Sequence, residues 1–145
     1  MTPDQKKAQD CAFDALERGD IQAAFIYISE EITADTHDLG DLYLAGELAL
    51  DLDLYQETIG FMNRVIEISN SEKDFWYLEE AYVVRAYAWL KMGRHDLTQD
   101  DLTHIDDDAQ VFWLKNHPVI DKKTLLSFMA TASNLTPKSS RNELR

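Results

Sequence analysis

The sequence is poor in the residues that make disulfides, cysteine-based metal sites and turns. Cys11 is the single cysteine, so neither an intrachain disulfide nor a cysteine cluster can form. Five glycines and three prolines among 145 residues leave long stretches that favour helix. No apolar run approaches the ~18 residues needed to cross a membrane, and the polar start MTPDQKKAQD is not followed by a signal-peptide core. We therefore expect a cytoplasmic, largely helical protein.

The sequence also lacks the motifs of common catalytic and metal sites. It has no phosphate-binding glycine loop, no G-x-S-x-G turn and no H-E-x-x-H motif. Asp100 and His104 could share a helix face, but no third metal ligand is fixed by the sequence. The aspartates at 106–108 lack the glycine and closing glutamate of a calcium loop. We expect no catalytic residue, cofactor or metal, and a metal protein or an enzyme is the least favoured alternative.

Cys11 has two interpretations. It lies at a position that should face the packing between helices, which favours a buried structural thiol. A nucleophilic role needs a base, and no histidine in its own segment is placed to activate the thiol. We therefore predict a structural role for Cys11.

Positive charge is scarce over most of the chain. The formal net charge is −13; residues 1–110 hold 8 basic and 25 acidic residues, a net charge of −17, whereas residues 111–145 carry +4. Such an acidic body repels nucleic-acid phosphates and anionic membrane surfaces. It attracts a basic protein, although the charge could serve solubility alone. We expect a protein or peptide partner, and neither nucleic acid nor membrane.

A helix–break–helix pattern is present in three copies. The breaks are Gly19, Asp53 and Gly93, which lie 34 and 40 residues apart. Small residues recur seven positions before the breaks (Ala12, Gly46, Ala86) and five positions after them (Ala24, Thr58, Thr98). Small side chains let two antiparallel helices approach, while the break turns the chain between them. The longer third spacing fits a polar loop, SNSEKD, at 69–74.

This pattern resembles the tetratricopeptide repeat, a 34-residue helix–turn–helix unit that stacks into a superhelix. The resemblance covers about residues 4–107. In the third unit, the family's aromatic, small, aromatic and glycine positions are occupied by Tyr82, Ala86, Trp89 and Gly93. In the second unit, Asp53 replaces the turn glycine. The resemblance implies an all-α fold, a tetratricopeptide-like α-solenoid of about three antiparallel helix pairs; a generic helical bundle is the alternative.

We expect one helical domain over residues 1–135. Its repeats should span about 4–35, 38–70 and 75–107. Repeat arrays leave an apolar face open at their ends, so we expect a capping helix within about 109–134, started by Asp121 and carrying the apolar residues Leu125, Leu126, Phe128 and Met129. The polar, basic tail at 136–145 should be frayed.

The resemblance implies that the first helix of each unit lines a concave groove. The expected partner-binding residues are Asp10, Phe13, Leu16 and Glu17, with Gln9 beside them, in the first unit; Tyr43, Leu44, Glu47, Leu50 and Asp51 in the second; and Val83, Val84, Tyr87, Leu90 and Lys91 in the third. Apolar anchors beside carboxylates suit a segment that presents basic and apolar side chains. Alternatively, the capping helix or a second copy of the chain fills this groove.

These expectations favour a non-enzymatic module that binds and masks a basic partner. Small acidic cytoplasmic proteins act this way as immunity proteins against toxins or as chaperones of secreted substrates. The acidic tails bound by chaperone-type tetratricopeptide clamps are a poor fit, because only Lys91 in the expected groove is basic. A homodimeric scaffold is the alternative, with Tyr87 and Trp89 in an exposed apolar patch.

Overall fold

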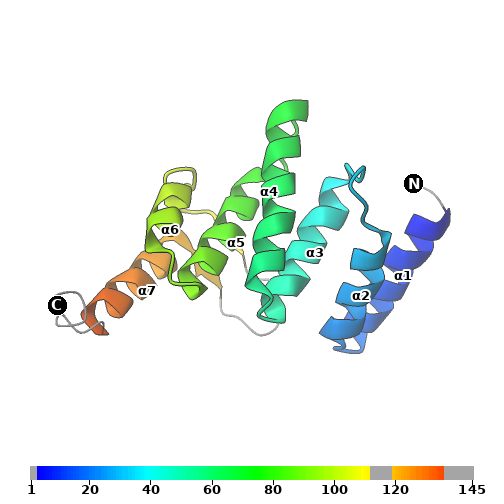
Figure 1. Cartoon of the computed structure of the whole chain (residues 1–145), viewed down its shortest axis with the longest axis horizontal. Coiled ribbons are helices and arrows are strands. Elements are labelled where there is room, and N and C mark those ends of the chain that lie inside the picture. Colours follow the sequence, from blue (N-terminus) through cyan, green and yellow to red (C-terminus); the bar gives the residue numbers. More distant parts are fainter. Residues whose placement is uncertain (1–2, 112–118, 136–145) are drawn as a thin grey trace.

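The computed structural model describes residues 3–111 and 119–135. In these two ranges the chain forms seven helices and one two-stranded sheet (Figure 1). The helices form three consecutive pairs: α1 (Pro3–Glu17) with α2 (Ile21–Glu31), α3 (Leu39–Asp51) with α4 (Tyr55–Glu72), and α5 (Leu78–Lys91) with α6 (His95–Leu102). The expected all-α stack of helix pairs is confirmed. No helix in the described ranges combines the length and apolar character that a membrane span requires.

The three sequence breaks are the three turns within the pairs. Gly19 and Gly93 have φ of 77°, and Asp53 has φ of 60°. This left-handed conformation has no steric cost for glycine and a modest one for aspartate, which is among the residues that tolerate it best. The Asp53 carboxylate also accepts a hydrogen bond from the Tyr55 hydroxyl at 3.0 Å. Both residue types at the breaks therefore satisfy the same backbone requirement.

The small residues lie where the paired helices touch. Ala12, Ala24 and Ala86 are fully buried, and a Cβ atom at Gly46 would lie 2.5 Å from Met62 Cε. Thr98 is buried as well, and its hydroxyl donates across the pair to the Ala86 carbonyl at 3.2 Å. Threonine at this contact thus keeps its hydroxyl satisfied without separating the helices.

The helices lie in two layers. Packing of α3 against α5, and a hydrogen bond between α1 and α3, place the three first helices in one layer, the inner layer. The second helices α2, α4 and α6 form the outer layer. Arg85 of α5 joins the layers, because its guanidinium pairs with Asp101 of α6 at 2.6 Å and donates to Asn63 of α4 at 2.8 Å.

After α6 the chain forms two short strands, which were not expected, in addition to the expected capping helix. Strand β1 (Gln110–Val111) pairs antiparallel with β2 (Ile120–Asp121), and α7 (Lys122–Leu135) follows. Strands of two residues are too short to give an alternating pattern in the sequence. Asp121 caps α7 as predicted, since its carboxylate accepts the Thr124 N–H at 2.7 Å. The expected tail at 136–145 lies outside the described residues.

The C-terminal elements return to the third pair. Both strands and α7 pack against α5, and Val111, Ile120 and Leu125 belong to the same apolar core as α3, α4 and α5. Of the apolar residues expected on the capping helix, Leu125 is buried and Met129 is partly buried, whereas Leu126 and Phe128 are exposed. Helix α7 therefore covers α5 with one side only.

Candidate partner-binding surface

The inner layer is open to solvent at the first unit. Phe13 of α1 is 52% exposed, and Asp10 and Glu17, three residues before and four after it, are exposed as well. Residues at these spacings share one face of a helix. Leu16 is partly buried beside them. The first unit therefore presents a large aromatic side chain between two carboxylates.

A hydrogen bond connects this face to the next inner helix. Gln9 Nε2 donates to Asp41 Oδ1 at 2.6 Å, and burial raises the pKa of the Asp41 carboxyl. Lys6 forms an exposed ion pair with Asp10 at 3.9 Å, one turn along α1. Exposed pairs of this kind contribute little and leave the Asp10 carboxylate available to another cation.

The second unit is closed. Tyr43, Glu47, Leu50 and Asp51 are all buried, and Leu44 is partly buried. Tyr43 stacks on Tyr77, which lies in the loop just before α5, with ring centroids 5.0 Å apart. In this conformation, these expected groove residues are packed inside the protein, and a partner can contact them only after they are uncovered.

Glu47 is the most unusual side chain of this closed part. It is 8% exposed, it accepts a hydrogen bond from the Tyr43 hydroxyl, and its Oε2 atom has no hydrogen-bond partner. Burial raises its pKa to about 7, and the neighbouring charges of Asp51 and Glu80 act in the same direction. Burial in a low-dielectric environment disfavours the charged carboxylate, so Glu47 takes up a proton far more readily than an exposed glutamate.

The third unit is covered by the C-terminal elements. Val83, Val84 and Tyr87 are buried, and the Tyr87 ring lies 6.3 Å from that of Phe128 on α7. This arrangement agrees with the alternative that the capping helix occupies the groove there. Leu90 is partly buried and Lys91 is exposed at the margin. Together with Tyr87, His95 and Phe128, they line a shallow cavity of about 200 Å³.

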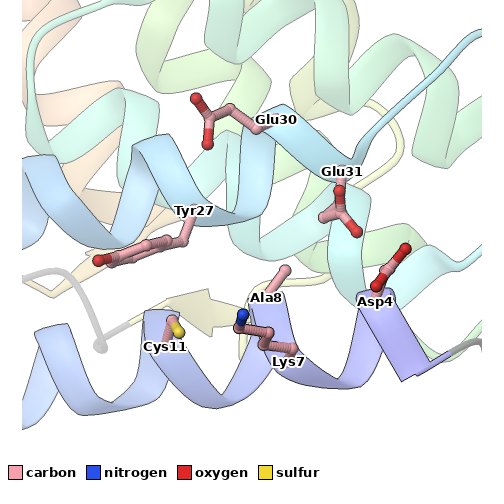
Figure 2. Close-up of a pocket in the computed structure, with 7 residues that line it drawn as sticks. All are labelled: Asp4, Lys7, Ala8, Cys11, Tyr27, Glu30 and Glu31. Carbon is pink, nitrogen blue, oxygen red and sulfur yellow. The ribbon is translucent and has the colours of Figure 1, made fainter.

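A second cavity lies between α1 and α2, away from the expected groove. Its volume is about 210 Å³. Figure 2 shows its lining, which consists of Asp4, Lys7, Ala8 and Cys11 from α1 and Tyr27, Glu30 and Glu31 from α2. Cys11 was expected to be buried, but it is only partly buried and contributes to this cavity. Its position at the solvent-facing side of the α1–α2 interface accounts for the difference.

The acidic end of the third unit has structural partners. The His104 ring stacks on Tyr82 at 4.4 Å, and Asp101 pairs with Arg85. The Glu79 carboxylate accepts the Asp106 N–H at 2.8 Å. Among the residues that the structure describes, no three histidine, cysteine or acidic side chains converge as metal ligands.

Among the residues that the structure describes, the two most exposed aromatic side chains were not predicted as binding residues from the sequence. Phe75 and Trp76, in the loop between α4 and α5, are 54% and 79% exposed. They stand at the start of the predicted third repeat, just after the predicted polar loop at 69–74, of which only Lys73 and Asp74 lie outside α4. Two adjacent aromatics before Tyr82, the first patterned position of that repeat, were the available signal, because the repeat pattern assigns them no place in the core.

Comparison with known proteins supports the fold. The N-terminal domain of stress-induced protein-1 (STI-1) from C. elegans superposes on this chain with a TM-score of 0.61, covering 90% of this chain and 98% of that domain at 13% sequence identity. Neither the protein-family models nor the curated proteins give a match. At this identity the likeness carries the fold alone. Together with the three helix pairs, it shows that the chain has the tetratricopeptide-like fold that its sequence pattern implied.

Proposed function

We propose that this chain is a non-enzymatic protein-interaction module that binds a basic protein or peptide. The observation that carries the proposal is Phe13, exposed on the inner layer between Asp10 and Glu17. An exposed aromatic anchor beside carboxylates fits a partner that places an apolar side chain next to lysine or arginine. The contact surface is smaller than the groove expected from sequence, because the second and third units are closed.

The charge of the whole chain supports a basic partner. A net charge of −17 over residues 1–110 raises the rate of encounter with a cationic protein at low salt. Masking a basic partner is the task of immunity proteins that inhibit toxins and of chaperones that hold secreted substrates. The immunity-protein and chaperone assignments both rest on charge and size. A cytoplasmic location is likewise a prediction. The product of the neighbouring gene is the natural first partner to test.

The test reverses charge only on the open face. Tagged protein is used to capture partners from its native host at low and high salt, and each captured partner is then purified and titrated by calorimetry. We expect Asp10→Lys with Glu17→Lys, and separately Phe13→Ala, to weaken binding at least about tenfold. Glu57→Lys with Glu67→Lys is the matched control, because these exposed residues of α4 lie in the outer layer and change the net charge equally. Equal weakening by both charge-reversed proteins would rule out a specific site on α1.

The homodimeric alternative loses its main support. Tyr87, one of the two aromatics expected in an exposed contact patch, is buried beneath the C-terminal elements, and Trp89 is only partly exposed. No described feature of this part of the surface favours a second copy over a basic partner.

A further inference from the structure

The loop between α4 and α5 carries a prominent exposed apolar feature. Trp76 is 79% exposed and Phe75 is 54% exposed. The loop lies where α4 ends and α5 begins, and the end of α4 extends beyond the neighbouring helices at the upper edge of Figure 1. Tryptophan and phenylalanine have large apolar side chains, so leaving them exposed forgoes much hydrophobic stabilisation. Tryptophan is also enriched among the residues that dominate protein interfaces. An exposed pair on a projecting loop therefore indicates an interaction site.

Local contacts hold this loop in one conformation. Lys73 ends α4 in the left-handed conformation, with φ of 57°, and the Asp74 N–H donates to the Ser69 carbonyl at 3.1 Å. The Asp74 carboxylate in turn accepts the Trp76 N–H at 3.3 Å. Immediately after the exposed pair, Tyr77 is fixed by stacking on Tyr43. Because these contacts restrain the backbone around Trp76, binding there loses less conformational entropy than binding by an unrestrained loop.

The surroundings of the aromatic pair are acidic. Glu72 and Asp74 precede it and Glu79 and Glu80 follow it, whereas Lys73 is the single basic residue in 72–80. The same field acts on Tyr77, whose pKa is raised first by burial and then by the charges of nearby acidic residues, Asp38 first among them. Negative charge around an apolar centre is complementary to a surface with the opposite arrangement.

We propose that Phe75 and Trp76 form a second docking point, which receives a protein surface with an apolar pocket rimmed by lysine or arginine. A basic partner is favoured over a second copy of this chain, because a second copy would bring like charges together around the same aromatics. The docking point uses a loop between α4 and α5, so it is independent of the Phe13 surface. Phe75 and Trp76 can therefore dock a partner even if α1 binds nothing.

Site-specific fluorine NMR tests this proposal on the full chain. The chain has three tryptophans, so protein labelled with fluorotryptophan gives separable signals, and Trp76→Phe identifies that of Trp76. The probes are two short synthetic amphipathic peptides, one of leucine, lysine and arginine, the other with glutamate at every basic position. We expect the basic peptide to shift the Trp76 signal, and Phe75→Ala to weaken the affinity read there at least about tenfold.

The controls separate this site from the α1 surface. Phe13→Ala should change the affinity read at Trp76 by less than about twofold, as should Ile26→Ala, which removes a comparable exposed apolar side chain on α2. The melting temperature of Phe75→Ala should equal that of the parent protein, because removing this exposed side chain leaves no cavity.

A Trp76 signal that does not change with the basic peptide, or that responds equally to the acidic one, overturns the proposal. So does a shift caused by protein concentration alone, which indicates a second copy, or by phosphatidylcholine vesicles, which indicates a membrane.

Discussion

The buried environment of Glu47 changes the role that its position in the sequence predicts. Its place in the helical pattern marked it as a groove-facing carboxylate, and sequence spacing alone cannot tell whether other segments cover that face. In the structure it is buried, hydrogen-bonded to Tyr43 at one oxygen and unpartnered at the other. A buried, half-satisfied carboxylate destabilises the folded protein when it is charged.

The pKa of Glu47 predicts how stability varies with pH. Its folded-state pKa of about 7 lies above the ordinary glutamate pKa of 4.5, so the folded protein binds the proton more tightly than the unfolded chain. Its contribution to stability is therefore full below about pH 4.5 and is lost as the pH rises through 7. Glu47→Gln keeps an acceptor for Tyr43 and removes this loss, so at pH 8 it should raise the free energy of unfolding by about 2–3 kcal/mol.

Urea denaturation of both proteins at pH 5 and pH 8 measures this effect. The gain from Glu47→Gln should be small at the lower pH and largest at the higher one. Glu67→Gln on the exposed side of α4 is the control, and it should leave the pH profile unchanged. Profiles that run parallel for the parent and Glu47→Gln proteins would contradict the assigned burial of the carboxyl group.

At the scale of single elements, the sequence predicted most of the fold. Gly19, Asp53 and Gly93 marked the turns because a left-handed backbone position has few acceptable residues. The small residues around them marked the contacts between paired helices. The two short strands were not predictable, because their register depends on burial of Val111 and Ile120 against α5. Short strands fixed by tertiary packing leave no periodic signal.

Two helical glycines provide an element-scale prediction. A Cβ atom at Gly46 would lie 2.5 Å from Met62 Cε and 3.3 Å from Phe61 Cβ, whereas at Gly60 it would meet nothing within 4 Å. Gly46→Ala should force the buried Met62 side chain, whose terminal methyl group is the atom met at 2.5 Å, to repack, and should lower the free energy of unfolding by about 1 kcal/mol. Gly60→Ala should raise it by about 0.5–1 kcal/mol, because alanine favours the helix. Denaturation curves for the two single variants check both signs, and a stabilising Gly46→Ala would show that Met62 can move aside without cost.

At the scale of the whole molecule, the candidate site was predicted only in part. Of the residues expected to line the groove, Asp10, Phe13 and Glu17 on α1 are exposed, whereas most of those on α3 and α5 are buried. Closure of α5 depends on a C-terminal segment that returns from beyond α6, and repeat spacing contains no information about that return. The charge asymmetry between residues 1–110 and 111–145 was readable, but it does not specify that α7 packs against α5.

The packing of α7 gives the prediction at this scale. Leu125 is fully buried against the core, while its neighbour Leu126 is 45% exposed. Leu125→Ala should lower the free energy of unfolding by about 2–4 kcal/mol and increase binding of a hydrophobic dye, because α5 becomes less well covered. Leu126→Ala should change stability by less than about 0.5 kcal/mol. Thermal melts and dye fluorescence measured together check the pair; equal behaviour of the two variants would argue against docking of α7 through Leu125.

The order of contacts along the stack has a consequence for how the chain folds. From α1 to α6, each helix packs against the next one in the sequence, so these interfaces close short loops and carry a small entropic cost. Helix α7 is the exception, because it passes α6 to reach α5. The helix pairs can thus assemble in any order from local contacts, whereas the C-terminal elements have a docking surface only after the third pair exists. Synthesis from the N-terminus produces the elements in the same order, with the covering segment emerging after the three helix pairs.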